Sequence, residues 1–141
     1  MQIRQSIIED MVRIADFDHL AKLDRDRLPE IRRAIGQNEC WSITEDENVV
    51  GYVIINHEFF HRRFLCLIYI DENYRGKGMG RQAIKWCKET IRKPFFVSTN
   101  LSNARMIHLL RSEGFEDSGI IYNLDPGDPE VVFIYREGAG V

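Results

Sequence analysis

The stretch IDENYRGKGMGR, residues 70–81, decides the fold because it joins an apolar run to an amphipathic helical pattern. Three of its glycines fall within five residues, so the main chain can turn tightly and point successive N–H groups into one concavity. At the positive end of a helix dipole, such a concavity suits a diphosphate. The glycines are Gly76, Gly78 and Gly80, and the neighbouring cations are Arg75, Lys77 and Arg81. The stretch therefore predicts an anion-binding loop that works mainly through its backbone.

Two other phosphate-binding loops are rich in glycine, and the sequence fits neither. A P-loop ends in Gly-Lys-Ser/Thr, which holds magnesium, and residues 70–81 lack that ending. A dinucleotide-binding fold places its loop in the first βαβ unit, whereas this loop follows a series of strand-like runs. A purely structural turn remains the plain alternative to a binding loop.

Upstream of the loop, apolar periodicity predicts one strand, two helices and an antiparallel meander of three strands. A polar turn at residues 45–48 separates the first two strands of the meander, and a polar, His-rich connection precedes the third. Pro29 begins the second helix and Gly36 closes it. The expected elements are a strand at Met1–Ile7, helices at Ile8–Asp24 and Leu28–Ile35, and strands at Cys40–Thr44, Val49–Ile55 and Phe64–Ile70.

Downstream of the loop, the pattern predicts a helix, a strand, a second helix and two final strands. Pro94 ends the first of these helices, Ser102 or Asn103 caps the second, and Gly114 stops it. The expected elements are a helix at Gly80–Ile91, a strand at Phe95–Ser98, a helix around Met106–Leu110, and strands at Phe115–Leu124 and Val131–Tyr135. The order β-α-α-β-β-β-α-β-α-β-β predicts an α+β fold with one partly parallel sheet.

The bulk composition indicates one globular domain. The chain has 141 residues, 44% of them hydrophobic, and we expect a single domain over residues 1–136 with a tail at 137–141. No apolar run approaches the roughly 20 residues that cross a bilayer, so we expect a cytoplasmic protein. A formal net charge of −3 argues against nucleic acid and membranes as partners. Three separated cysteines, Cys40, Cys66 and Cys87, suggest buried free thiols rather than a metal site.

Two motifs resemble the GNAT superfamily of CoA-dependent N-acyltransferases. Residues 75–80, RGKGMG, are similar to its signature Arg/Gln-x-x-Gly-x-Gly/Ala. Residues 103–115 resemble its later helix, which opens with Asn and closes with Gly-Phe. The resemblance covers essentially the whole chain. It implies a GNAT fold, in which a mixed, mostly antiparallel sheet with flanking helices is splayed around acyl-CoA.

The resemblance also implies how the co-substrate acetyl-CoA is held, with no metal. The backbone of residues 68–70 would pair with the pantetheine arm, the loop would hold the diphosphate, and Asn103 would contact the pantetheine or the adenosine end. The residues implied in CoA binding are Ile68, Tyr69, Ile70, Arg75, Gly76, Lys77, Gly78, Met79, Gly80, Arg81 and Asn103.

The chain departs from the family at the catalytic positions. Many members carry a Tyr that protonates the leaving thiolate, and here that position is Leu110, which has no proton to give. Tyr69, Tyr74 and His108 are substitute donors. Some members use a Glu within the strand that precedes the loop, which here has no carboxylate. The nearest candidate bases are His57, Glu58 and His61, with a bound water as relay.

From these candidates we select Tyr69, Glu58 and His61 as catalytic residues. The predicted reaction transfers an acetyl group from acetyl-CoA to a primary amine of a small molecule or peptide by direct attack in a ternary complex. A non-catalytic acyl-CoA-binding or sensing module and a nucleotide-binding protein are the alternatives.

Acidic residues occupy the two segments that usually shape the acceptor pocket in this family. They predict a cationic amine acceptor through charge complementarity, although exposed loops are generally polar. They are Asp24, Asp26, Asp125, Asp128 and Glu130. The sequence leaves a homodimer open.

Overall fold

The order of helices and strands along the chain is the one that the sequence predicts, β-α-α-β-β-β-α-β-α-β-β. The computed structural model describes residues 1–136, so the predicted tail at 137–141 lies outside the described residues. The helices are α1 (Met11–Phe17), α2 (Arg27–Gly36), α3 (Met79–Thr90) and α4 (Ala104–Ser112). The strands are β1 (Gln2–Gln5), β2 (Cys40–Glu45), β3 (Asn48–Phe59), β4 (Arg62–Ile70), β5 (Phe95–Asn100), β6 (Glu116–Ile121) and β7 (Glu130–Tyr135).

The strands of residues 1–136 form one mixed sheet in the order β1-β2-β3-β4-β5-β7-β6. The pairs β1–β2, β2–β3, β5–β7 and β6–β7 are antiparallel. The pair β4–β5 is parallel, with Phe64 opposite Phe96 and Leu65 opposite Val97. The predicted α+β class with a mixed, mostly antiparallel sheet is therefore confirmed.

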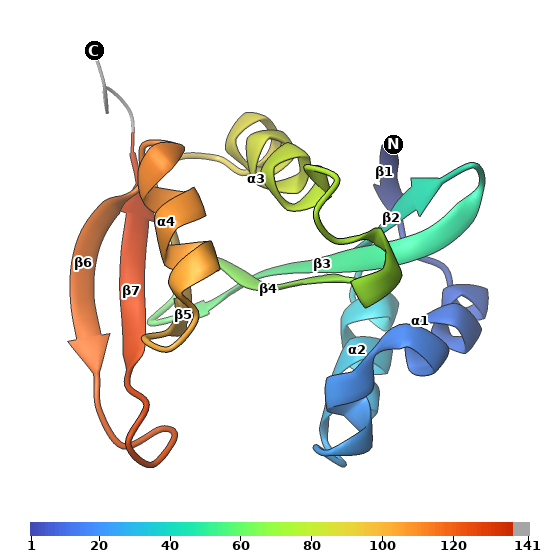
Figure 1. Cartoon of the computed structure of the whole chain (residues 1–141), viewed down its shortest axis with the longest axis horizontal. Coiled ribbons are helices and arrows are strands. Elements are labelled where there is room, and N and C mark those ends of the chain that lie inside the picture. Colours follow the sequence, from blue (N-terminus) through green and yellow to red (C-terminus); the bar gives the residue numbers. More distant parts are fainter. Residues whose placement is uncertain (137–141) are drawn as a thin grey trace. The chain divides into compact units, whose positions relative to one another are not determined.

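The residues gather into two compact units. Of the described residues, the first unit contains Met1–Ile55 and Leu67–Ala83, and the second contains Asn56–Cys66 and residues 84–136. In the first unit, α1 and α2 lie on the same side of β3 (Figure 1). The buried residues of these helices include Ile14, Phe17 and Ile31.

The predicted helix at Ile8–Asp24 is wrong in its length, because the chain leaves the helical conformation at Asp18. Only Met11–Phe17 is α-helical, between 3₁₀ turns at Ile8–Asp10 and His19–Lys22. Asp18 is extended, with φ −81° and ψ 92°, and its carboxylate accepts hydrogen bonds from the N–H groups of Leu20 and Ala21. An Asp that caps a following turn competes with continuation of the helix before it.

The predicted His-rich connection between the second and third meander strands is mostly strand. β3 continues to Phe59 and β4 begins at Arg62, so only Phe60 and His61 form the turn, both with positive φ. Aromatic packing explains the extension, since the ring of Phe59 lies 4.9 Å from that of Phe64 and 5.2 Å from that of Phe96. These contacts bury apolar surface that a polar loop would leave exposed.

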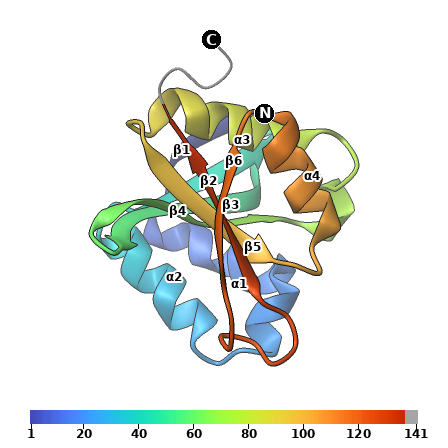
Figure 2. The ribbon, with the colours of Figure 1, turned by 90° about the vertical axis from the view of Figure 1, so that its left-hand side faces the viewer.

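In the second unit, α4 lies beside the three strands β5, β7 and β6 (Figure 2). The fully buried side chains of Phe95, Leu110 and Phe133 form its core. Glu113 follows α4 and is buried, where Lys85 and Lys88 of α3 pair with its carboxylate at 3.3 and 3.0 Å. β6 ends at Ile121, three residues before the predicted end at Leu124, which is exposed.

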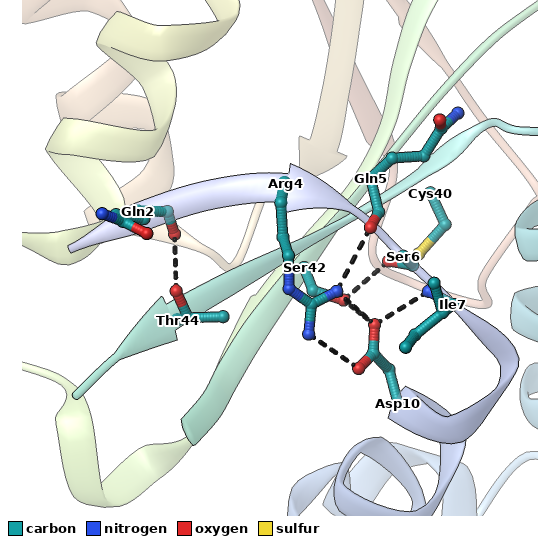
Figure 3. Close-up of polar contacts among 9 residues, drawn as sticks. All are labelled: Gln2, Arg4, Gln5, Ser6, Ile7, Asp10, Cys40, Ser42 and Thr44. Atoms are coloured by element: carbon teal, nitrogen blue, oxygen red, sulfur yellow. Dashed lines mark hydrogen bonds and ion pairs between the residues drawn. The ribbon is translucent and has the colours of Figure 1, made fainter. Parts of the chain in front are cut away.

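In the first unit, the buried carboxylate of Asp10 holds the segment that leads into α1 (Figure 3). Arg4 donates to both of its oxygens, at 2.8 and 2.9 Å. The N–H of Ile7 and the hydroxyl of Ser42 donate to Oδ2 at 2.9 and 2.8 Å. Burial by itself would raise the pKa of Asp10, but these hydrogen bonds bring it below its ordinary value of 3.8.

We predict that Asp10→Asn lowers the free energy of unfolding by about 2 kcal/mol near neutral pH, because Arg4 and Ser42 lose a charged acceptor. The pKa of Asp10 is depressed in the folded state, so the carboxylate stabilises the fold fully above 3.8, and this stabilisation is lost as pH falls through the lowered pKa. Urea denaturation at a series of pH values should show wild type and variant converging in acid.

Asp16→Asn is the matched control, because Asp16 is exposed and pairs with Arg13 at 3.3 Å on the surface of α1. It should change the free energy of unfolding by less than about 0.5 kcal/mol. An equal effect of the two substitutions, or an Asp10→Asn effect that grows in acid, would contradict this role of Asp10.

Candidate functional site

The glycine loop after β4 has the geometry that its sequence predicts. Gly76 and Gly78 have positive φ angles of 78° and 82°, and α3 begins at Met79. A Cβ built on either glycine would meet no heavy atom within 4 Å, so the space over the loop is open. Glycine is required here for the backbone conformation and leaves room for a ligand to approach the main chain.

The backbone of this loop offers donors to a ligand. Within residues 1–136, the N–H groups of Gly76, Lys77 and Gly78 donate to no carbonyl or side-chain acceptor. The first N–H groups of α3 add to them, because the first turn of a helix has no intrahelical acceptors. Open space, free N–H groups and the positive end of the helix dipole fit a diphosphate.

The cations predicted around the loop make different contacts. The guanidinium of Arg75 lies 5.1 Å from the centre of the Tyr69 ring, and its Nε donates to the carbonyl oxygen of Ile70 at 2.9 Å. Lys77 lies over the ring of Tyr74, with Nζ 5.0 Å from the centre. Arg81 is half-buried in the first turn of α3. The structure therefore joins the loop to Tyr69 through Arg75.

Tyr69, near the end of β4, lies in a row of aromatic rings. Its ring stacks at 6.1 Å on Phe17 of α1 and at 6.0 Å on Tyr52 of β3. Its hydroxyl oxygen accepts the backbone N–H of His19 at 3.1 Å. Because the oxygen is the acceptor in this bond, the hydroxyl proton remains available for another group.

A buried polar network beside Tyr69 was missed by the sequence analysis. Asp18 is fully buried, and its Oδ2 accepts hydrogen bonds from Nε of Arg27 at 2.8 Å and from the hydroxyl of Tyr52. Burial and the bond to Asp18 raise the pKa of Tyr52, so its hydroxyl stays protonated and acts as the donor. Arg27 in turn lies over the Tyr69 ring, 5.3 Å from its centre. The sign of this network in the sequence is that Asp18 interrupts the helical spacing of the apolar residues around it.

Comparison with known proteins decides the family. Residues 5–115 match the family model described as the acetyltransferase (GNAT) family. The chain belongs to the GNAT acetyltransferase family. No curated protein matches this GNAT chain by sequence.

Solved structures share the fold of this GNAT acetyltransferase. A GNAT-family acetyltransferase from Bacillus cereus is 28% identical, with a TM-score of 0.86 over 96% of each chain. The YncA protein of Salmonella typhimurium, solved with acetyl-CoA, is 18% identical, with a TM-score of 0.74 over 96% of this chain and 93% of that one. A spermidine N-acetyltransferase chimera from Vibrio cholerae is 16% identical, with a TM-score of 0.75 over 95% and 94%. At such low identities, the last two show the fold alone.

The candidate bases of this GNAT protein lie in the second unit, whereas Tyr69 lies in the first. Glu58 belongs to β3 and His61 to the two-residue turn, and both side chains are exposed, as is that of His57. The side chains of His57 and Glu58 therefore extend from a strand, whereas the sequence predicts a polar connection at these positions. Their catalytic roles remain predictions.

The later helix of this GNAT chain has the predicted ends. Oδ1 of Asn103 accepts the N–H of Met106 at 3.2 Å, which confirms it as the cap of α4, and its Nδ2 donates to Oγ1 of Thr99 at 3.2 Å. Gly114 closes the helix with φ of 90°. Leu110 is fully buried, so it serves the core of its unit, and His108, a candidate proton donor, is exposed.

Two of the three cysteines, Cys40 and Cys87, are fully buried. Burial raises the pKa of Cys40 to about 11 and that of Cys87 to about 12, so both remain protonated near neutral pH. Cys66 is half-buried. Within residues 1–136, no group of three or more His, Cys, Asp or Glu side chains is arranged to hold a metal ion. None of the helices in this part of the chain is long and apolar enough to cross a bilayer.

A close approach of two backbones fixes the end of β4. A Cβ built on Gly51 of β3 would lie 2.6 Å from the carbonyl oxygen of Tyr69 and 3.0 Å from Cδ1 of Ile70. A main-chain oxygen cannot move aside as a flexible side chain can, so any larger residue must displace the strand. Gly51 is therefore a positioning residue for Tyr69 and for the loop that follows.

We predict that Gly51→Ala lowers the free energy of unfolding by roughly 1–3 kcal/mol and weakens CoA binding, because the added methyl group displaces β4 at Tyr69. Gly36→Ala is the control, since a Cβ at Gly36 meets no atom within 4 Å and the residue ends α2. It should be neutral or stabilising by up to about 1 kcal/mol. Urea denaturation and calorimetry with CoA measure both effects, and full stability of Gly51→Ala would refute the close approach.

Proposed function

We propose that this GNAT protein transfers an acetyl group from acetyl-CoA to the primary amine of a small molecule or peptide, with residues 1–136 acting as one domain. The observation that carries the proposal is the open glycine loop, whose free N–H groups follow directly after the strand that contains Tyr69. The Salmonella neighbour solved with acetyl-CoA supports the choice of co-substrate.

Binding of acetyl-CoA would use the main chain first. The N–H groups of residues 76–80 would hold the diphosphate, with Lys77 and Arg81 contributing positive charge. The backbone of Ile68, Tyr69 and Ile70 would pair with the pantetheine arm, and Asn103 would contact the pantetheine or the adenosine end. Main-chain donors are fixed before the ligand arrives, so little ordering is lost on binding.

Direct attack fits the chemistry of the described residues. The amine nitrogen forms a bond to the thioester carbonyl carbon, the bond from carbon to sulfur breaks, and CoA leaves as a thiolate. Cys40 and Cys87 are protonated and buried, so neither supports a covalent acetyl-enzyme intermediate. Holding the two substrates in one complex supplies much of the rate enhancement.

Proton transfer requires one acceptor and one donor. An amine is mostly protonated at neutral pH, and Glu58 or His61 would accept its proton through a water. Tyr69 would give its hydroxyl proton to the thiolate, since the hydroxyl oxygen is oriented by the N–H of His19. Backbone N–H groups near Tyr69 would stabilise the oxyanion.

The acidic loops give limited support to the expected cationic acceptor. Asp125 accepts a hydrogen bond from Asn100 at 2.9 Å, and Asp128 accepts two from Ser102, at 3.0 and 2.6 Å. Glu130 accepts one from the hydroxyl of Ser98 at 2.7 Å. These carboxylates stabilise the loop between β6 and β7, so we propose a primary amine as acceptor without requiring a polycation.

We predict that Gly78→Glu abolishes CoA binding in a folded protein, because it places a carboxylate where the diphosphate belongs and strains a residue with positive φ. Isothermal calorimetry with CoA and a coupled assay for thiol release measure the loss, which should exceed roughly 100-fold in Kd. Gly127→Glu is the matched control, since Gly127 also has positive φ and open space but lies in the loop before β7.

The two variants should have similar melting temperatures and differ only in CoA binding. Unchanged CoA affinity in Gly78→Glu would reject the loop as the binding site. Tight binding of acetyl-CoA by the wild type without thiol release, across a broad amine library, would favour the non-catalytic acyl-CoA-binding module.

A further inference from the structure

The side chain of Arg27 holds a buried hydrogen-bond donor that the fold does not use. Its Nε donates to Asp18, whereas Nη2 is buried and has no acceptor anywhere in residues 1–136. A buried donor without an acceptor costs free energy, and more so when it belongs to a charged group. The Arg27 side chain as a whole is 14% exposed.

Asp18 cannot accept this donor as well, because its oxygens are already occupied. Oδ1 accepts the N–H groups of Leu20 and Ala21 at 3.0 and 3.2 Å. Oδ2 accepts Arg27 Nε and the hydroxyl of Tyr52. A carboxylate offers about four lone-pair sites, so the pairing with Arg27 is held to one bond instead of the usual two.

The surroundings of this donor favour a negatively charged ligand. Arg27 and Arg75 both lie against the ring of Tyr69, at 5.3 and 5.1 Å from its centre, and the buried carboxylate of Asp18 pairs with Arg27. The two carboxylates that follow Tyr69 in the chain lie beside basic side chains. Asp71 pairs with Arg13 at 3.6 Å, and an oxygen of Glu72 lies 3.2 Å from Nε2 of His19.

We propose that Arg27 binds a carboxylate on the acceptor, so that the amine substrate of this acetyltransferase carries a carboxylate, as an amino acid does. The inference rests on the proposed acetyl transfer, since it places the acceptor beside Tyr69. The planar guanidinium edge matches a carboxylate in shape and charge, and the aromatic rings exclude water from the contact. Arg27 thus selects the acceptor and positions its amine.

The test compares three forms of each acceptor: the free amino acid, its amide and the amine that lacks the carboxyl group. A panel of amino acids is assayed with acetyl-CoA by thiol release, using wild type, Arg27→Lys and Arg33→Lys. Wild type should show kcat/KM at least tenfold higher for the acid than for its amide or amine. Arg27→Lys should remove this preference mainly by raising KM, with CoA affinity unchanged.

Arg33→Lys is the matched control, because Arg33 lies on the same helix and pairs with Glu30 and Glu39 at its exposed face. It should keep the preference for acids. Dipeptides with a free amino terminus, with and without a C-terminal amide, distinguish a free amino acid from a peptide as the source of the carboxylate. If Arg27→Lys proves unstable, the turnover of acids, amides and amines by wild type still tests the proposal.

Equal wild-type turnover of acids, amides and amines would overturn the carboxylate site and leave acetyl transfer standing. If no acceptor is acetylated, calorimetry of the same amino acids with CoA-saturated protein decides the outcome. If amino acids bind to wild type and not to Arg27→Lys, the result supports the carboxylate site and rejects acetyl transfer. If no amino acid binds, the result overturns both the carboxylate site and acetyl transfer.

Discussion

The carboxylate of Asp18 accepts hydrogen bonds from a 3₁₀ turn, from α2 and from β3, and the position of Tyr69 depends on them. Asp18 ends α1, starts the turn at His19 and bonds to Arg27 and Tyr52, which both lie against the ring of Tyr69. Both oxygens of this fully buried side chain are hydrogen-bonded, so moving Asp18 would break several hydrogen bonds at once. The hydroxyl of Tyr69 is oriented by the turn that Asp18 caps.

Glycines at two places in the chain link the position of Tyr69 to the binding of a ligand. Gly51 lets β3 pass within van der Waals distance of the Tyr69 carbonyl, which fixes the end of β4. Gly76 and Gly78 then allow the backbone to turn and to leave its N–H groups unpaired within the described chain. The first glycine permits the close approach of the two strands, and the other two allow the open conformation of the loop that follows.

Much of the fold and the binding loop could be predicted from the sequence because both depend on local chemistry. The RGKGMG stretch requires glycines for positive φ, and Asn103 and Gly114 cap and stop a helix by local hydrogen bonds. The network of Asp18, Arg27 and Tyr52 could not be predicted, because Arg27 and Tyr52 lie 9 and 34 positions from Asp18 in the sequence. In the sequence alone, Asp18 and Arg27 look like ordinary charged surface residues. The length of β3 was missed for a similar reason, since ring contacts of Phe59 override the polar sequence around it.

We propose that the backbone N–H groups after β4 hold the diphosphate of acetyl-CoA. An NMR titration of ¹⁵N-labelled protein follows these groups directly, with CoA as one ligand and pantetheine, which has no diphosphate, as the other. We expect CoA to shift the amide signals of Gly76, Lys77 and Gly78, and pantetheine to leave them unchanged. Binding of CoA that leaves these amide signals in place would contradict the proposal.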